Sequence, residues 1–286
     1  MIITRLKGGL GNQMFQFAMG YSLAKQKNTK LALDTVSGFV RDRVFKRSFS
    51  LDKLGITDFI KGSAFDRFLF RWVGKFPALL FFFKKPILSN LHSNQDTDFI
   101  FQGYLSRHIR LDGYWHFAGN CEEYQDNLFE IFSSRLNSPD KFLDKSGINP
   151  AKDIALCMRF FEEIPGIDQH NMATETGFYQ KALTSIYKKG EQKIIVFSSD
   201  SIRAKNCLDT MGIEEDEYRL LTGDLGYADE IEILAFMSYF TKLIISNSSF
   251  YWWAGWLAGM RNKHTIVIAP EIKGKNGYYP VDWKLI

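Results

Sequence analysis

The second half of the chain alternates short apolar segments with amphipathic ones, and this alternation constrains the fold more than any other feature. In chain order the segments predict strand, helix, strand, helix, helix, strand, helix and strand, at residues 153–160, 175–189, 193–200, 201–212, 228–240, 242–248, 249–259 and 264–270. Apolar strands that alternate with helices are typical of a parallel sheet covered on both faces. The sequence therefore predicts the α/β class, with one doubly wound, Rossmann-like domain at residues 150–286.

The first half begins with a unit of the same kind. The apolar stretch MIITRL is followed by KGGLGNQMFQFA, which has the composition of a glycine turn leading into a helix, and then by the strand-like KLALD. We expect residues 1–149 to form another Rossmann-like domain that carries a helical, phenylalanine-rich insertion. Two such domains facing each other would hold a ligand in the cleft at the carboxyl ends of their strands.

The glycine turn admits several interpretations. Gly9 and Gly11 match two glycines of the G-x-G-x-x-G dinucleotide pattern, but Met14 stands where the third is needed, which disfavours a nicotinamide or flavin site. The glycines could instead serve only the backbone of a tight turn between strand and helix. The adjacent amides of Asn12 and Gln13 suit either the hydroxyls of a sugar or a cross-link to a neighbouring loop.

Composition excludes several classes of function. A net charge of +4 fits an anionic ligand or anionic lipid but is too small for a nucleic-acid-binding surface, so we expect no nucleic acid partner. The cysteines, Cys121, Cys157 and Cys207, are too widely spaced to predict a disulfide framework or a metal site. The first residues lack the pattern of a signal peptide, and we expect a cytoplasmic protein.

One segment could contact a membrane. The apolar run 76–83 is too short to cross a bilayer, which takes about 20 helical residues. Together with the preceding residues 67–75 it mixes Phe, Trp, Arg and Lys in the manner of a helix that lies in the membrane interface. The sequence therefore leaves two expectations, a peripheral contact with the inner face of the membrane and simple aromatic packing within a helical subdomain.

Polar residues follow three of the predicted strands. Ser248 and Ser249 lie where a strand gives way to a helix, a position that favours an anion such as phosphate. Asp200 could accept a hydrogen bond from a ribose or a base. The aspartate and one serine could equally be ordinary helix N-caps. Arg159, directly after an apolar strand, is suited to hold a pyrophosphate and to stabilise the charge that develops on it as it leaves.

Four segments carry a family resemblance. GGLGNQMFQFA, VFSSD and IISNSSFYWWAGWLA resemble motifs of glycosyltransferase family 11, the α-1,2-fucosyltransferases, and LDGYWHF resembles the family's L-x-G-Y-F/W-Q segment. The resemblance implies a GT-B-like fold of two Rossmann-like domains, GDP-fucose as the sugar donor, inversion at the anomeric carbon, and no metal or other cofactor. It also implies a glycan acceptor, with O2 of a terminal galactose as the attacking group.

The resemblance further implies which residues form the site. Residues 150–286 would bind the nucleotide sugar through Arg159, Asp200, Asn247, Ser248, Ser249 and Phe250. Residues 1–149 would form the acceptor side of the cleft with Gly9, Gly11, Asn12 and Gln13. The glycine turn is then expected to shape a sugar-transfer cleft rather than to bind a dinucleotide.

The chain departs from the family in its central motif. Where the family has H-x-R-R-x-D, this sequence has CMRFFE, which retains Arg159 but places Cys157, Phe160 and Glu162 at the other defined positions. We expect Arg159 to stabilise the leaving group and Glu162, or its neighbour Glu163, to be the candidate base, the alternative being that both are solvated loop carboxylates. The lost histidine and arginine leave two alternatives to a fucosyltransferase: a catalytically weakened protein that binds a GDP-sugar or glycan, and a transferase that uses another GDP-sugar.

Overall fold

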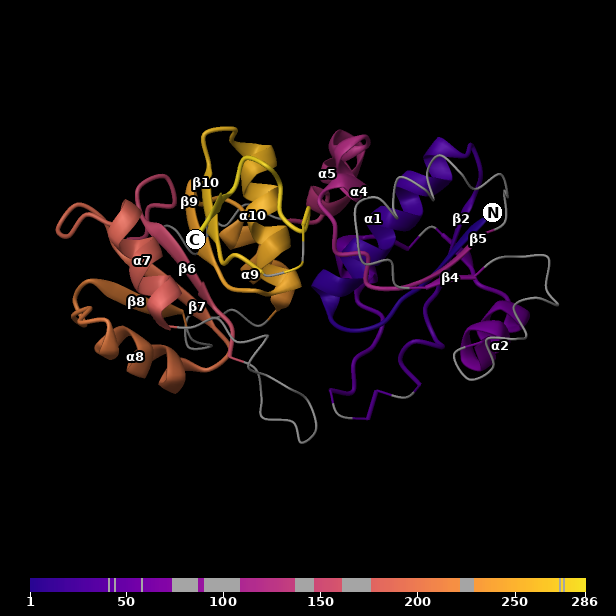
Figure 1. Cartoon of the computed structure of the whole chain (residues 1–286), viewed down its shortest axis with the longest axis horizontal. Coiled ribbons are helices and arrows are strands. Elements are labelled where there is room, and N and C mark those ends of the chain that lie inside the picture. Colours follow the sequence, from indigo (N-terminus) through magenta and orange to yellow (C-terminus); the bar gives the residue numbers. More distant parts are fainter. Residues whose placement is uncertain are drawn as a thin grey trace. The chain divides into compact units, whose positions relative to one another are not determined.

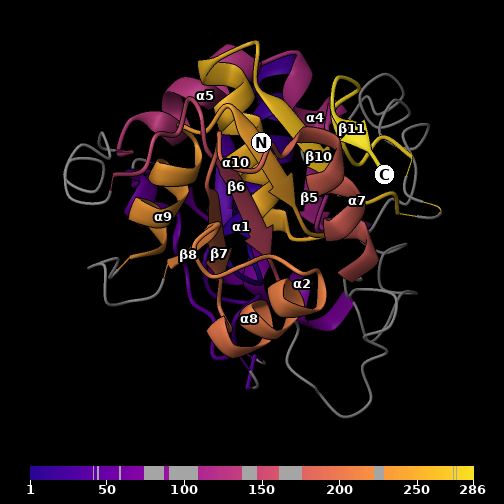
Figure 2. The same ribbon diagram turned by 90° about the vertical axis from the view of Figure 1, so that its left-hand side faces the viewer.

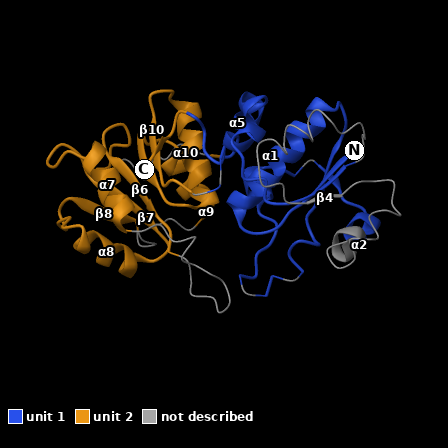
Figure 3. Cartoon of the chain, in the orientation of Figure 1, with its two compact units in different colours: residues 1–135, 273–281 blue, residues 136–272, 282–286 orange. Residues whose placement is uncertain are grey.

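The computed structural model describes residues 1–40, 42–43, 45–57, 59–73, 87–89, 109–136, 147–160, 176–221, 229–272, 274 and 276–286. The chain divides into two compact units, one formed by residues 1–135 and 273–281 and the other by residues 136–272 and 282–286 (Figure 3). The sequence placed the change of domain at residues 149–150, and the structure places the change of unit at residues 135–136. The short stretch 273–281, near the end of the chain, belongs to the first unit.

The first unit contains, within its described residues, a five-stranded parallel sheet of order β3-β2-β1-β5-β4. Its strands are β1 (Ile2–Arg5), β2 (Leu31–Asp34), β3 (Ile60–Lys61), β4 (Ile87–Ser89) and β5 (Ile109–Asp112). Its helical elements are α1 (Leu10–Gln26), the 3-10 helix η1 (Leu51–Leu54), α2 (Ala64–Val73), α4 (Gly119–Glu122) and α5 (Gln125–Ser133). Strands β2 and β3 lie on one side of β1, and strands β5 and β4 lie on its other side. The strand order therefore reverses between β1 and β5.

Helix α1 packs on this sheet and is largely buried. Met19 of α1 forms a core cluster with Ile2 of β1 and Leu111 of β5, all at 0% exposure. Gly20 lets the helix approach β1 closely, because a Cβ there would lie 2.2 Å from Thr4 Oγ1. The tight contact couples the helix that follows the glycine turn to the strand that precedes it.

The second unit contains, again within its described residues, a six-stranded parallel sheet of order β11-β10-β9-β6-β7-β8. Its strands are β6 (Ile154–Met158), β7 (Ile194–Ser198), β8 (Tyr218–Leu221), β9 (Lys242–Ile245), β10 (Ile266–Ala269) and β11 (Lys284–Leu285). Its helices are α7 (Thr176–Ile186), α8 (Ser201–Thr210), α9 (Glu230–Met237) and α10 (Ser249–Arg261). The predicted doubly wound parallel sheet is confirmed.

Helices cover both faces of the second sheet (Figure 1, Figure 2). On one face, Tyr179 of α7 and Leu208 of α8 pack with Leu156 of β6 in a single buried cluster. On the other face, Cys157 of β6 lies with its sulfur 3.6 Å from the sulfur of Met237 in α9. Alternate residues of β6 therefore point to opposite helical layers, and because both layers are apolar the whole strand is buried.

Helix α10 carries the tryptophan pair of the predicted helix 249–259. Trp252 and Trp253 are both at 0% exposure, with ring centroids 4.8 Å apart in an edge-to-face arrangement. Gly255 of the same helix faces Trp283, whose ring atoms would lie 3.1 Å from a Cβ placed there. The pair therefore packs the core of the second unit and offers no exposed ring face to a sugar.

Among the described residues, the structure contains no helix that is long and apolar enough to cross a membrane. The apolar run 76–83, for which the sequence allowed a membrane contact, lies outside the described residues.

Candidate functional site

The second sheet presents a polar edge where its strand order reverses. β6 lies between β7 and β9, and the chain continues outward to β8 on one side and to β10 on the other. The segments that follow β6, β7 and β9 carry Arg159, Asp200 and Ser248. Because the carboxyl ends of parallel strands meet at one edge, these segments are neighbours, and such a reversal is where open α/β sheets bind their ligands.

The start of α10 has the properties of an anion site. Ser248 is the N-cap residue with extended backbone angles, φ −134° and ψ 127°, but its side chain makes no capping hydrogen bond, and the first turn holds no acidic residue. The first backbone N–H groups of this 13-residue helix, from Ser249 and Phe250 onward, therefore point out at the positive end of the helix dipole. Asn247, directly before the cap, is half-buried.

A buried hydroxyl group, that of Ser246, lies shortly before the start of this helix. Ser246 is 1% exposed, and its Oγ makes no hydrogen bond to any residue that the structure describes. Its backbone is engaged, since its N–H donates to Cys157 O at 3.0 Å and its carbonyl accepts from Ser248 N at 2.8 Å. Ser246 thus ties the end of β9 to β6 and holds the start of α10 next to the residues that follow β6.

Arg159 follows β6 and is half-buried. Its Nη1 donates a hydrogen bond to Ser199 Oγ at 3.1 Å, which connects the segment after β6 with the segment after β7. A guanidinium has five N–H donors in a planar fork, a geometry that matches phosphate oxygens. The structure thus places Arg159 at the same polar edge as the start of α10.

Asp200 caps a helix. Its Oδ1 accepts a hydrogen bond from Arg203 N at 2.9 Å, and its Oδ2 lies 3.4 Å from Arg203 Nε. This is the N-cap interpretation that the sequence allowed for this residue. Its carboxylate is still about 37% exposed, so a hydroxyl could bind to it from the solvent side.

Two of the three departures from the family's central motif, Cys157 and Phe160, are apolar. Cys157 is at 0% exposure against α9, and burial raises the pKa of its thiol, so it is a neutral packing residue. Phe160 is partly buried against the core cluster of β6, α7 and α8. Glu162 and Glu163, the candidate bases, lie outside the described residues.

The first unit has its own polar edge, at the glycine turn. Gly8 has φ +79°, which favours glycine, and Gly9 is the N-cap of α1. Gln13 is at 0% exposure: its Nε2 donates to Gly8 O and to Ser48 O, both at 2.9 Å, and its Oε1 accepts from Ser50 N at 2.9 Å. These contacts are the loop cross-link that the sequence allowed as one interpretation of the amide pair.

Asn12 makes a different contact. Its Oδ1 lies 3.0 Å from Nε2 of His116, in the segment that follows β5, so the reversal point between β1 and β5 is bridged by this pair. Gly11 lies buried in the first turn of α1 and, as a glycine, contributes no side-chain contact there. Sequence reasoning used LDGYWHF only as part of a resemblance and did not single out His116. A polar residue shortly after a predicted strand, the signal used for Arg159, would have found it.

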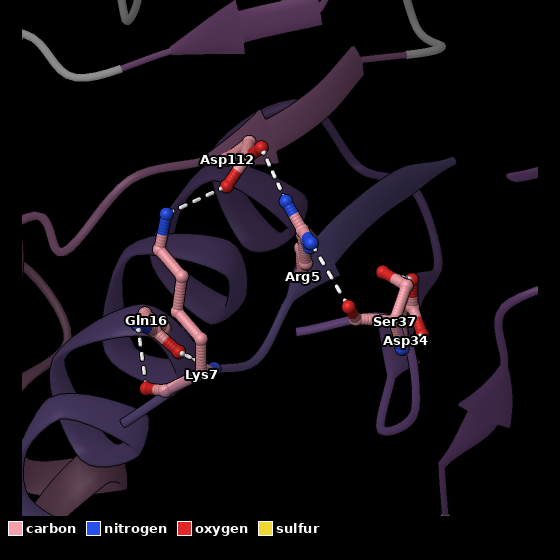
Figure 4. A network of polar contacts seen from close by, with 6 residues as sticks. All are labelled: Arg5, Lys7, Gln16, Asp34, Ser37 and Asp112. Atoms are coloured by element: carbon pink, nitrogen blue, oxygen red, sulfur yellow. Dashed lines mark hydrogen bonds and ion pairs between the residues drawn. The ribbon is translucent and has the colours of Figure 1, made fainter. Parts of the chain in front are cut away.

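An ion-pair network fixes the ends of the strands around this turn (Figure 4). Asp112, at the end of β5, accepts from Arg5 Nη1 at 2.9 Å and from Lys7 Nζ at 2.8 Å. Arg5 also donates from Nη2 to Ser37 O at 2.9 Å. The backbone of Lys7 exchanges two hydrogen bonds with Gln16, at 2.9 and 3.1 Å. Hydrogen bonds and ion pairs therefore connect the glycine turn, the loop that follows β2 and the end of β5.

Asp34 stands at the place of the ribose-binding acid in a dinucleotide fold, but it serves a turn. Its Oδ1 accepts from the N–H groups of Val36 and Ser37, each at 3.0 Å, and its Oδ2 accepts from Ser37 Oγ. With three hydrogen bonds to its own loop, this carboxylate does not point to a nicotinamide site. Among the described residues, no group of three or more His, Cys, Asp and Glu side chains is placed to hold a metal ion.

Comparison with protein families identifies one match. The model of glycosyl transferase family 11 matches residues 80–279, which is most of the chain. The resemblance drawn from the motifs is thereby confirmed.

Two relatives from Escherichia coli span nearly the whole chain. An alpha-1,2-colitosyltransferase is 28% identical over 298 residues, covering 100% of this chain and 98% of its own. The O-antigen biosynthesis glycosyltransferase WbnK is 29% identical over 294 residues, covering 93% of this chain and 92% of its own.

Solved structures share the fold at low sequence identity. A mutant of Arabidopsis thaliana FUT1 in complex with GDP has a TM-score of 0.51 at 13% identity, covering 90% of this chain and 68% of its own. The NodZ alpha-1,6-fucosyltransferase soaked with GDP-fucose, a Bradyrhizobium protein, has a TM-score of 0.50 at 14% identity, covering 90% and 91%. This likeness shows the fold, the two Rossmann-like units of GT-B glycosyltransferases, as the sequence predicted.

Proposed function

The chain belongs to glycosyl transferase family 11, and we propose that it transfers L-fucose with inversion from GDP-fucose to O2 of a terminal galactose in a glycan acceptor. In this proposal residues 150–286 bind the nucleotide sugar and residues 1–149 bind the acceptor. The observation that carries it is the polar edge of the second sheet, where Arg159 and the start of α10 follow the neighbouring strands β6 and β9.

The reaction needs positive charge at the leaving group. The acceptor hydroxyl attacks C1 of the sugar while the bond from C1 to the β-phosphate oxygen breaks, through a state with oxocarbenium character. Negative charge then grows on the departing diphosphate. Arg159 and the first N–H groups of α10 can stabilise it, so the proposal requires no metal.

The remaining residues of this edge would hold the nucleotide. Asp200 is exposed enough to accept a hydrogen bond from a ribose hydroxyl while it caps α8. The side chains of Asn247, Ser248, Ser249 and Phe250 are all half-buried at the start of α10, where a diphosphate and its attached groups would lie. Gly9, Gly11, Asn12 and Gln13 would shape the acceptor side, with Gln13 acting through the loop that it cross-links.

The names of the relatives support the class of donor and acceptor. The FUT1 and NodZ structures hold GDP or were soaked with GDP-fucose, one relative is named for an alpha-1,2 linkage, and another is named for O-antigen biosynthesis. We therefore propose an oligosaccharide of the O-antigen kind as acceptor, made in the cytoplasm with a peripheral contact to the inner face of the membrane. Colitose is the first alternative to fucose as the transferred sugar.

A binding protein of weakened activity is the second candidate function. Cys157 and Phe160 place apolar groups where the family motif has histidine and arginine, and both side chains pack into the core of the second unit. Losing one charge-assisted hydrogen bond to a phosphate would weaken the site by about 1.5–3 kcal/mol.

Transfer assays separate these candidates. The protein, in buffer with a chelator, is incubated with GDP-fucose, GDP-mannose, UDP-galactose or nucleotide-activated colitose, and with galactose-terminated oligosaccharides. We expect GDP release and a new α-1,2 linkage, read by NMR, with GDP-fucose. Transfer of colitose alone would replace the donor in the proposal, and GDP binding without any transfer would favour the binding protein.

A further inference from the structure

The reversal point of the first sheet holds a histidine to which the proposed function gives no role. His116 lies four residues beyond the end of β5, beside the first turn of α1, at the edge where strands β1 and β5 end. In an open α/β sheet this is a ligand-binding position in its own right. The role assigned to this edge rests on the proposed function.

The imidazole ring of His116 is held from several sides. Nε2 lies 3.0 Å from Oδ1 of Asn12. Phe15 and Tyr278 pack against the ring edge-on, with centroid distances of 4.9 and 5.8 Å, and Tyr114 stacks on it at 5.5 Å. Tyr114 is itself 40% exposed and His116 is half-buried, so the ring is fixed in orientation at the border of the solvent. Fixed orientation at an accessible place is what a proton-transfer group needs.

The backbone between these two rings is strained. Trp115 has φ +57°, in the left-handed region that a bulky side chain rarely occupies. The conformation is held by two hydrogen bonds to its carbonyl, from Phe117 N and from Asn120 Nδ2, both at 2.9 Å, and by burial of the indole to 3% exposure. Strain maintained by this many contacts is typical of loops that aim a functional side chain.

The carboxylates of this edge are committed elsewhere. Both oxygens of Asp112 are in ion pairs with Arg5 and Lys7, and Asp34 accepts three hydrogen bonds from its own loop. Lys7 is a cation whose Nζ lies 5.0 Å from the centre of the Tyr114 ring. Among the described residues of this edge, a group that accepts a proton near neutral pH must therefore come from another side chain, and histidine is the type whose ordinary pKa, about 6.5, suits that task.

The groups that face His116 keep their own charge near neutral pH. Burial raises the pKa of Tyr114, with further contributions from Asp42 and Asp112, and burial raises the pKa of Tyr278. Both phenols are therefore neutral where histidine titrates. From α1 the ring meets the uncharged Asn12 and Phe15, and beyond Tyr114 lie Lys7 and Asp112, which form an ion pair with each other.

We propose that His116 takes the proton from the attacking hydroxyl of the acceptor and that Asn12 is its positioning residue. With Oδ1 of Asn12 accepting from Nε2–H, the imidazole lone pair is on Nδ1. The acceptor O–H bond breaks and its proton goes to Nδ1, while the acceptor oxygen forms the new bond to C1. The bond from C1 to the diphosphate breaks, its electron pair leaves with GDP, and the imidazolium then loses its proton to water.

Glutamine is an informative replacement at this position. It is the residue of the family segment L-x-G-Y-F/W-Q that LDGYWHF resembles, and its amide can hydrogen-bond to Asn12 but cannot take a proton. The base is therefore a feature of this chain rather than of the segment that it resembles, and His116→Gln separates proton transfer from loop structure.

The test compares the wild-type protein with His116→Gln and with His264→Gln, a matched change at an exposed histidine of the second unit. Transfer rates are measured from about pH 5 to pH 9, and GDP binding is measured by calorimetry. We expect His116→Gln to lower kcat by about 10²-fold or more and to abolish the acidic limb of the pH profile, with GDP affinity unchanged. His264→Gln should match the wild type, and Asn12→Ala should shift the limb and lower kcat less.

Each other outcome is decisive. If wild-type protein transfers sugar but shows no acidic limb, or if folded His116→Gln transfers at the wild-type rate, the assignment of the base is wrong and the proposed function stands. If His116→Gln does not fold, the wild-type profile and the limb shift in Asn12→Ala decide the matter. If wild-type protein transfers no sugar, the proposed function and the base fall together.

Discussion

Replacing Asp112 by asparagine tests whether the ion-pair network in Figure 4 holds the first unit together. The carboxylate binds Arg5 at 2.9 Å and Lys7 at 2.8 Å, and the three side chains are only 18–21% exposed. Hydrogen bonds to charged groups contribute about 1.5–3 kcal/mol each. The amide of asparagine keeps one oxygen acceptor but turns an N–H group toward one of the two cations. Because solvent still reaches these side chains, the loss of stability is smaller than the sum of the two bonds. We expect the unit to be destabilised by about 2–3 kcal/mol.

Hydrogen exchange under native conditions is the suitable assay, because it reports on the two units separately. Amides of β1 and β5 should exchange faster in Asp112→Asn, by the factor that corresponds to this free energy, and those of β6 and β7 should not change. Asp126→Asn, at an exposed site in α5, is the matched control. If Asp112→Asn changes the β1 amides no more than Asp126→Asn does, the network contributes nothing measurable and the reasoning is refuted.

Three further predictions follow from single contacts. Gly38→Ala should destabilise the first unit by about 1–3 kcal/mol or more in urea unfolding, because a Cβ there would lie 1.9 Å from Leu6 O. A variant as stable as the wild-type protein would contradict this close approach. Burial alone would raise the pKa of Asp66, but hydrogen bonds from its neighbours and the Arg110 cation outweigh it and hold that pKa below its ordinary value. The ionised Asp66 carboxylate therefore stabilises the folded state fully above about pH 5, and this stabilisation is lost as the pH falls through about 4 and below. The free energy of unfolding of Asp66→Asn should lack this dependence on acid pH. Arg159→Ala should lower kcat by about 10²-fold in a transfer assay, and an unchanged rate would remove its assigned role.

Sequence reasoning predicted the second unit best, because buried parallel strands are continuous apolar runs. Strands β6, β7, β9 and β10 and helices α7 to α10 fall on the predicted segments. Strands β8 and β11 were missed for a physical reason. The residues Tyr218–Leu221 are all half-buried at the edge of the sheet, and Lys284–Leu285 is an exposed strand of two residues, so neither has the apolar pattern of a central strand.

At the candidate site, local sequence patterns predicted where the polar residues lie better than they predicted which residues these contact. The polar residues after β6 and β9 lie at one edge as expected, because the topology of a parallel sheet requires it. The contacts of Gln13 with Ser48 and Ser50, and of Asn12 with His116, join residues that are far apart in the chain. Spacing within one motif carries no information about such pairs, and the order of the strands was needed to see them.

Calorimetric titration with GDP in metal-free buffer tests whether the chain binds a GDP-sugar at the edge that carries Arg159 and the start of α10. We predict saturable binding of GDP and GDP-fucose and no binding of NAD. The affinity for GDP should be about 10-fold or more weaker in Arg159→Ala but unchanged in Arg135→Ala, an exposed control. Absence of GDP binding by the wild-type protein would contradict this prediction. The apolar replacements at Cys157 and Phe160 would then have removed the nucleotide site, and the transferase proposal would be withdrawn.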